Sequence, residues 1–548
     1  MSTTLTRGWA ALLAAGASIA LVGCGGGAQP AGTSSPPAET SPAAAVGDPV
    51  SGGAIRIGLN SALVCIDPHQ NASNTTIFIT RNLVDSLTDQ DPETGELKPW
   101  LATAWTANAD ATQYTFTLRD DVTFSDGTPL TAQTITKNLD WIKQAGPAVA
   151  SLANAYLSGY SGSTAVDEHT VQINFDQPNV QFLQATSTPT LGIFADATTA
   201  LPADERCQGK LVATGPFTLA SYNPQQAIEL ARRTGYDWGS ELRQHTGDAY
   251  LETATFNIVP EAGVRTGQLR NGELDLDTIP LTEDVKLFEA DANFNVVGRP
   301  YPGLGVTLIP NLARPVLQDV KVRQALLLAV NREELVAGVL TQYDGVPTSP
   351  LTSSTPLHQV IPGVRFAPDE AKQLLDEAGW VPGADGIREK DGAKLTLSAV
   401  YHFSRGSTAA MELVQQQYRA IGVDLQLNLP DPGDLAKYTS SGDFDLWFTP
   451  FHRAEADTLR STLSFYAGNT GRAPEARPVD ELLTKGSQET DPAKRQELIT
   501  QAATELIDQA YAIPLYELAG VFATSGKVQG LVMDATSRLN LYDVWLSA

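Results

Sequence analysis

One strand–helix–strand pattern constrains the fold more than any other feature of this sequence. Residues 393–403 (AKLTLSAVYHF) and 422–429 (GVDLQLNL) alternate apolar and polar side chains, which is the pattern of a half-buried strand. Between them, a helix that carries Met411, Leu413, Val414 and Tyr418 is predicted. Two strands joined by a helix form a parallel pair with a right-handed crossover, so the sequence predicts a mixed α/β fold.

The same pattern predicts where a ligand would bind. In sheets of this kind, ligands lie beyond the carboxyl ends of the strands. Tyr401, His402 and Phe403 end the first strand of the pattern. Residues 449–453 lie at the end of a further predicted strand, FDLWFTPF (444–451). Both sets are therefore expected to lie near any cleft.

Other segments predict further strands and helices. Residues 55–59 alternate as a strand, and a turn is expected at Asp126-Gly127, before a helix over 131–141. In PDEAKQLLDEAGW, a proline at the first helical position and a glycine after the last predict a helix over residues 368–378. No internal repeat is found.

The amino terminus has the parts of a secretory signal. Arg7 precedes an apolar run over residues 9–22, which is too short to span a bilayer. The next residues complete the motif Leu-Val-Gly-Cys, ending at Cys24, which resembles the bacterial lipobox. We therefore expect a signal peptide over 1–23, a lipidated Cys24 that anchors the chain at a membrane surface, and a flexible tether over 24–51. The alternative is an ordinary signal peptide with an incidental cysteine.

Charge and cysteine content restrict the partners and the compartment. The chain has 62 acidic against 37 basic residues and a net charge of −25, which disfavours nucleic acid and anionic lipid surfaces as partners. Besides Cys24 there are two cysteines, Cys65 and Cys207. In an exported protein these two are expected to form a disulfide, with two buried free thiols as the alternative.

Motifs of common catalytic sites are absent from the sequence. It has no P-loop, no GxGxxG after a strand, no HExxH, no CxxC and no GxSxG, and its six histidines lack metal-ligand spacing. Asp275 and Asp277 would share one face of a strand and make a metal conceivable, although an exposed strand edge is favoured. No cofactor, resident metal or catalytic residue is therefore predicted.

Many segments, in a fixed order, resemble one protein family. They are GGAIRIG, Asp67-Pro68, NLVDSLT, KPWLATAW, YTFTLRDDVTFSDGTPLTA, TGPFTLASY, LRNGELDLDTIP, LQDVKVRQALLLAVNREEL, APDEAKQLLDEAGW, YRAIGVDLQL and AIPLY. From about Gly52 to the carboxyl terminus, the chain resembles the extracellular solute-binding proteins of ABC importers, family 5. That family includes dipeptide-, oligopeptide- and nickel-binding members.

The resemblance implies a two-lobed periplasmic-binding-protein-like fold of type II, in the large cluster C form, with an extra domain inserted in lobe one. Lobe one would comprise residues 52–93, 212–303 and 517–548. The inserted subdomain would comprise residues 94–211, and lobe two residues 304–516. On this map Cys65 and Cys207 lie near the two joints between the insert and lobe one.

The resemblance also implies a function. The two lobes would be joined by hinges near residues 301–311 and 512–520, would close around a small solute, and would deliver it to ABC permease subunits in the membrane. A monomer that binds short peptides is the first expectation, and nickel, a metallophore complex or another organic solute is the alternative. Two other classes stay open: an extracellular lipoprotein hydrolase and a receptor that reports occupancy to a membrane sensor.

The candidate ligand-binding residues follow partly from a departure from the family pattern. Peptide binders of the family hold the ligand's α-amino group with an aspartate that follows the strand corresponding to 444–448, but here His452 and Arg453 stand near that place. A basic pair would suit a ligand carboxylate or a metal chelate. The candidates for ligand contact are Leu63, Tyr401, His402, Trp447, Phe448, His452, Arg453 and Asp457. The alternatives are exposure to water for His452 and Arg453, core packing for Trp447, and a structural role for Asp457.

Overall fold

The computed structural model describes residues 47–548. The predicted signal peptide over 1–23 and the predicted lipidation site at Cys24 lie outside the described residues, as does most of the predicted tether over 24–51. Within residues 47–548, no helix combines the length and the apolar character needed to cross a bilayer.

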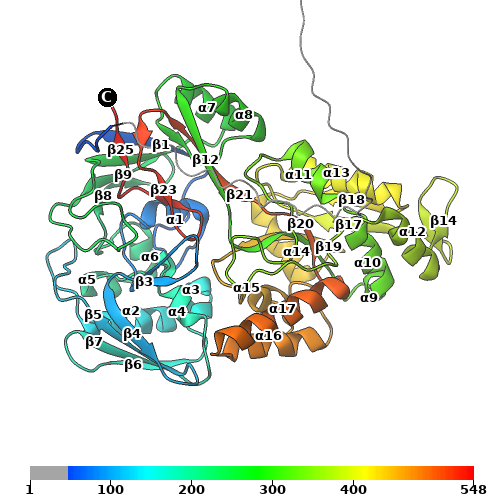
Figure 1. Ribbon diagram of the computed structural model, residues 1–548, viewed down its shortest axis with the longest axis horizontal. Helices are drawn as coiled ribbons and strands as arrows, with labels where there is room; N and C mark the ends of the chain where they lie inside the picture. Colours follow the sequence, from blue (N-terminus) through cyan, green and yellow to red (C-terminus); the bar gives the residue numbers. More distant parts are fainter. Residues whose placement is uncertain (1–46) are drawn as a thin grey trace, which may run out of the picture. The chain divides into compact units, whose positions relative to one another are not determined.

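The first large sheet collects strands from three distant parts of the chain (Figure 1). Its seven strands are β1 (Ala54–Leu59), β8 (Phe217–Asn223), β9 (Ala227–Arg232), β10 (Thr253–Ile258), β11 (Leu276–Asp277), β12 (Phe294–Pro300) and β21 (Ala519–Ser525). They run in the order β12-β21-β11-β1-β10-β9-β8, and β1 is parallel to both of its neighbours. The apolar side chains that predict β1, at positions 55, 57 and 59, are all fully buried. All seven strands fall in the ranges predicted for lobe one.

Three helices and several short strands complete this part of the chain. The helices are α1 (Asn74–Thr80), α7 (Ala262–Arg270) and α8 (Thr282–Glu289), and the short strands are β2 (Thr88–Gln90), β22 (Val528–Gln529), β23 (Val532–Met533), β24 (Leu539–Asn540) and β25 (Trp545–Leu546). β2 pairs with β3 (Leu97–Pro99), which lies in the range predicted for the insert. Ser73 caps α1 because its hydroxyl accepts a hydrogen bond from the backbone N–H of Thr76.

A second, four-stranded antiparallel sheet lies within the range predicted for the insert. Its strands are β4 (Ala102–Ala107), β5 (Gln113–Leu118), β6 (Tyr160–Ala165) and β7 (Thr170–Phe175), and the helices of this range are α2 (Ala132–Ala145), α3 (Ser151–Tyr156), α4 (Phe182–Ala185), α5 (Asp196–Thr199), α6 (Ala203–Cys207) and a 3₁₀ turn over Pro189–Leu191. The Thr131 hydroxyl caps α2, and Ile135, Leu139 and Ile142 bury its apolar face. The insert and lobe one share one continuous hydrophobic core.

A buried cluster joins the insert to lobe one. Cys65 and Cys207 form a disulfide, which is the pairing predicted from the sequence. Beside it, the fully buried Arg206 forms an ion pair with Asp67, with 2.8 Å between Nε and Oδ2. Its guanidinium lies 3.6 Å from the ring centroid of Trp141. The ion pair compensates a charge that would otherwise be costly to bury.

The third sheet forms the centre of lobe two. Its strands are β13 (Gly303–Pro310), β17 (Thr396–Val400), β18 (Asp424–Asn428), β19 (Leu446–His452) and β20 (Ile513–Tyr516), in the order β18-β17-β19-β13-β20. The predicted strand–helix–strand unit is present as β17, α13 (Ser407–Ala420) and β18, and the two strands are parallel. Residues 393–394, which the pattern assigns to the first strand, instead pair in a small sheet made of β14 (Val381–Pro382), β15 (Arg388–Lys390) and β16 (Ala393–Lys394).

Helices surround this sheet and share its separate core. They are α9 (Pro315–Gln318), α10 (Val320–Leu328), α11 (Arg332–Val339), α12 (Pro368–Glu377), α14 (Leu435–Ser441), α15 (Thr458–Leu463), α16 (Pro478–Gln488), α17 (Pro492–Asp508) and a 3₁₀ turn over Pro432–Asp434. The predicted helix at 368–378 is α12, which begins at Pro368 as expected.

The chain passes between the two large sheets at two places. Tyr301 and Pro302 separate β12 from β13, and Glu517 and Leu518 separate β20 from β21. These two short connections fall inside the segments that the sequence predicts as hinges.

A buried ion pair holds the second connection. Arg405 binds both carboxylate oxygens of Asp344, at 2.7 and 2.8 Å. The same two side chains bind the backbone of Ala519: Asp344 accepts from its N–H at 2.8 Å, and Arg405 donates to its carbonyl at 2.9 Å. The first residue of β21 is therefore fixed to lobe two.

Candidate functional site

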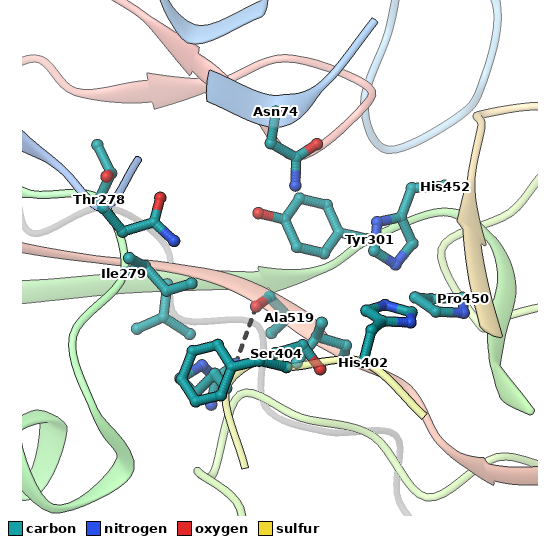
Figure 2. A pocket seen from close by; sticks show the side chains of 14 residues that line it. Asn74, Thr278, Ile279, Tyr301, His402, Ser404, Pro450, His452 and Ala519 are labelled. Atoms are coloured by element: carbon teal, nitrogen blue, oxygen red, sulfur yellow. Dashed lines mark hydrogen bonds between the residues drawn. The ribbon is translucent and has the colours of Figure 1, made fainter. Parts of the chain in front are cut away.

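A cavity of about 270 Å³ lies where the two lobes and their connections meet (Figure 2). From the predicted lobe one it is lined by Asn60, Asn74, Thr278 and Ile279. From lobe two it is lined by His402, Phe403, Ser404, Arg405, Pro450 and His452. Tyr301, Leu518, Ala519 and Val521, in or beside the connections, complete the wall.

The lobe-two wall is built at the carboxyl ends of two parallel strands. β17 ends at Val400, just before the lining residues that begin at His402, and β19 ends at His452 itself. Gly303, the first residue of β13, lies very close to β19. A Cβ at this position would overlap the backbone carbonyl of Phe451, so only glycine fits there. The placement agrees with the rule that ligands bind at this edge of such sheets.

Aromatic rings and imidazoles face this cavity. The Tyr301 ring stacks on the His452 ring, with 4.4 Å between centroids and 18° between planes. The His402 ring meets Phe448 edge-on at 5.4 Å. Figure 2 shows both imidazoles on the same side of the cavity. This wall offers flat apolar surface together with nitrogen atoms that can donate or accept hydrogen bonds.

Both histidines are held in the neutral state. Burial lowers the pKa of His402. Burial also lowers the pKa of His452 to about 3, with smaller contributions from the positive charge of Arg538 and from His402. At neutral pH each imidazole therefore has one N–H donor and one nitrogen lone pair.

The cavity wall contains no carboxylate among the described residues. Its one charged side chain is Arg405, whose charge is compensated by Asp344 behind the wall. An ammonium group in the cavity would therefore find no opposite charge on the wall, whereas an acceptor group would meet several donors.

The structure brings only two of the predicted ligand residues to the cavity, His402 and His452. Tyr401, Trp447 and Phe448 are instead buried in the core of lobe two. Tyr401 packs against Phe448, with 6.2 Å between ring centroids.

The remaining predicted residues also lie elsewhere. Leu63 is buried in the core of lobe one. The guanidinium of Arg453 lies over the rings of Phe451 and Tyr156, at 4.5 and 5.3 Å, and so contacts the insert. Asp457 accepts two hydrogen bonds from Arg460, at 2.7 and 2.9 Å.

Several residues that line the cavity could not be predicted from the sequence. Asn60, Asn74 and Thr278 are ordinary polar residues, and only the folded chain brings them together. Tyr301 does have a signal, because it begins the segment predicted as the first hinge.

The described residues contain no group of three or more histidine, cysteine or carboxylate side chains able to hold a metal ion. The two aspartates that made a metal conceivable are engaged by arginines: Asp275 pairs with Arg56 and Asp277 with Arg265, each at 2.9 Å. The first pair ties β1 to the residue before β11, and the second ties α7 to β11.

Two lobes joined by two short connections, with a cavity between them, define the class of solute receptors that close around a ligand. Comparison with known proteins makes the class specific. The family described as "Bacterial extracellular solute-binding proteins, family 5 Middle" matches residues 96–472. The chain belongs to family 5 of the bacterial extracellular solute-binding proteins, which confirms the resemblance stated from the sequence.

Curated relatives of the chain are binding proteins. The nickel-binding periplasmic protein of Escherichia coli (strain K12) is 26% identical over 440 residues, which cover 77% of this chain and 81% of the relative. The dipeptide-binding protein of the same organism is 25% identical over 484 residues, covering 82% and 86%. These names and the family confirm that the chain is a solute-binding protein and not an enzyme.

Solved structures confirm the fold. NikA from Brucella suis in complex with Fe(III)-EDTA has a TM-score of 0.80 and 23% identity, covering 90% of this chain and all of that one. The oligopeptide-binding protein AppA from Bacillus subtilis, in complex with a nonapeptide, has a TM-score of 0.75 and 21% identity, covering 91% and 100%.

Proposed function

We propose that this protein is a lipid-anchored extracytoplasmic receptor of an ABC importer, which captures a small solute between its lobes and delivers it to a membrane permease. The cavity at the meeting point of the two lobes carries the proposal, because it takes its walls from both lobes and from both connections. Membership of the solute-binding family supports it. The lipobox-like motif at Cys24 supports the anchor.

The same arrangement suggests how binding would be signalled. A solute that contacts both walls is bound more tightly when the lobes are closed, so it shifts the equilibrium toward the closed form. The connections at Tyr301-Pro302 and Glu517-Leu518 are only two residues long. The two lobes would therefore move as rigid bodies that rotate about these connections. The permease would then recognise the closed pair of lobes.

Short peptides are the ligand class predicted from the sequence, and one relative is named a dipeptide-binding protein. The cavity modifies this prediction, because no carboxylate among the described lining residues is available to pair with an α-ammonium group. We therefore propose that a bound peptide is held through its backbone and its carboxylate, and not through its amino group.

A metal chelate is the second candidate, and the two neutral imidazoles favour it. Neutral imidazole is a common ligand for transition metals. Two histidines are too few to hold a metal by themselves, so the chelator would supply the other donor atoms. The relatives named for nickel and for Fe(III)-EDTA bind metals or chelates.

Native mass spectrometry of the full-length protein, purified from its own host, tests the receptor proposal. A small solute that copurifies and is recovered unchanged after prolonged incubation supports it. Addition of that solute should raise the melting temperature by mass action and compact the particle in X-ray scattering. A solute that is converted to a product, or one that stabilises the protein without compacting it, would contradict the proposal.

Cell fractionation tests the anchor. The natural protein should sediment with membranes and carry a lipid on Cys24, whereas a Cys24→Ser variant should be released in soluble form. A Cys24→Ser variant that remained in the membrane fraction would refute the lipid anchor without affecting the proposed binding function.

A further inference from the structure

A buried arginine lies behind the cavity wall without an acidic partner of its own. Arg538 is only 8% exposed. Its Nε and Nη2 both donate to Oδ1 of Asn74, at 3.1 and 2.9 Å. Within residues 47–548, no carboxylate lies within ion-pair distance of its guanidinium.

The carboxylate of Asp534, which accepts from the backbone of Arg538, is committed to other groups. Oδ1 of Asp534 accepts hydrogen bonds from the backbone of Arg538 and from the backbone and hydroxyl of Thr536. Its Oδ2 lies 3.8 Å from Nε of Arg81. The negative charge of Asp534 is thus shared with a second arginine, and the Arg538 charge is only partly compensated.

This arginine fixes the orientation of the Asn74 amide. A guanidinium can only donate hydrogen bonds, so the atom of Asn74 that faces Arg538 must be the oxygen. The amide nitrogen must then point the other way. Figure 2 shows it directed into the cavity, toward the ring of Tyr301. In the described part of the chain, no group accepts a hydrogen bond from this nitrogen.

The charge of Arg538 also reaches the cavity. Burial is the main cause of the lowered pKa of His452, on the opposite wall, and the charge of Arg538 is the next largest cause. Arg405, the one cation that lines the cavity, is compensated by Asp344, and no described lining residue is acidic. The region around Asn74 therefore combines an unpaired donor with a positive potential. A neutral acceptor would use only the donor, whereas an anionic oxygen would use both.

We propose that Asn74 and Arg538 form the subsite for a carboxylate of the bound solute. Asn74 is the contact residue, and Arg538 is a positioning residue that orients the amide and supplies the positive charge. The inference rests on the proposed receptor function and specifies its ligand class as carboxylate-bearing. Peptides and aminopolycarboxylate chelators share this group.

Acetate and its neutral counterpart acetamide are matched probes for this subsite. They would be titrated at constant ionic strength into the mature protein labelled selectively at its six histidines, and the His452 signal would be followed by NMR. Assignment would come from a His452→Gln variant. Acetate should shift the signal saturably and bind at least about tenfold more tightly than acetamide, because only acetate pairs with the charge. Equal binding of the two, or no saturable response, would overturn the proposal.

Three variants separate recognition from folding. Asn74→Asp keeps an oxygen for Arg538 and gives it an ion pair, so the melting temperature should hold or rise while acetate binding is lost. Arg538→Gln should abolish the preference for acetate over acetamide. Lys437→Gln is the matched control, because it removes one positive charge from an exposed side chain and should leave the preference intact. If Asn74→Asp still bound acetate as the natural protein does, the subsite would be refuted.

A competition experiment distinguishes the two sources of the carboxylate. The dipeptide Met-Leu or Fe(III)-EDTA would be added to the acetate-saturated protein, and the one that displaces acetate identifies the ligand class. Failure of both to displace it would count against a solute subsite. The receptor proposal would remain standing in that case, because it rests on the copurified solute.

Discussion

Glu517, in the second connection between the lobes, has a buried carboxyl group whose protonation can be tested. It lies between β20 and β21 and is 1% exposed. Ser353 donates to its carboxylate through the backbone N–H at 3.0 Å and the hydroxyl at 2.6 Å. No cation in the described part of the chain pairs with it. Burial therefore raises the pKa of Glu517 to about 7, against the opposing effect of the two hydrogen bonds.

The raised pKa predicts how stability depends on pH. A folded-state pKa above the unfolded value of 4.5 means that the folded protein binds the proton more tightly. The stabilisation is fully present below pH 4.5 and is lost as the pH rises through 7. Because one pKa unit corresponds to about 1.4 kcal/mol, the loss amounts to up to about 3 kcal/mol.

The Glu517→Gln variant removes this dependence. Glutamine is neutral at every pH, so its stability relative to the natural protein should improve by up to about 3 kcal/mol between pH 4.5 and pH 8. Urea unfolding at both pH values measures the difference, and an exposed-site variant, Glu475→Gln, controls for the loss of a carboxylate. Parallel stability curves for natural protein and Glu517→Gln would refute the assignment of a protonated carboxyl at this connection.

Three further predictions concern buried groups. Arg453→Ala should lower the free energy of unfolding by about 1–3 kcal/mol through lost ring contacts, but leave solute affinity measured by calorimetry unchanged, since the side chain does not reach the cavity. Reduction of the Cys65–Cys207 disulfide, which closes a separation of 142 residues, should cost up to about 5 kcal/mol and lower the melting temperature; an unchanged value would contradict its structural role. Asp344→Asn should destabilise by about 3–5 kcal/mol in urea unfolding because it leaves Arg405 buried and unpaired, and a loss below 1 kcal/mol would argue against that ion pair.

The spacing of apolar residues predicted those strands and helices that bury one face in a core. The alternation at residues 55–59 reflects which side chains face a core, and those side chains are buried as expected, as are Met411, Val414 and Tyr418 of the predicted helix. Such patterns are local, so they can be read without knowing the partners across the sheet.

The cavity could be predicted only in part. The rule for strand ends located His402 and His452, because their place depends on sheet topology alone. The same rule could not tell them from Tyr401 and Arg453, since adjacent residues of an extended chain face opposite sides and the sequence did not show which side faces the cavity. Asn74 was beyond prediction because its role arises from Arg538, which is 464 residues away in the chain.

The position of β21 has a consequence for the biogenesis of the protein. This strand lies between β12 and β11 in the first sheet, yet it is formed by residues 519–525 of a 548-residue chain. A polypeptide emerging amino terminus first cannot fill that gap until residues 519–525 have been synthesised. The seven-stranded sheet of the first lobe is thus completed only after the strands of the second lobe have been made, so the two lobes cannot fold strictly in the order of their synthesis.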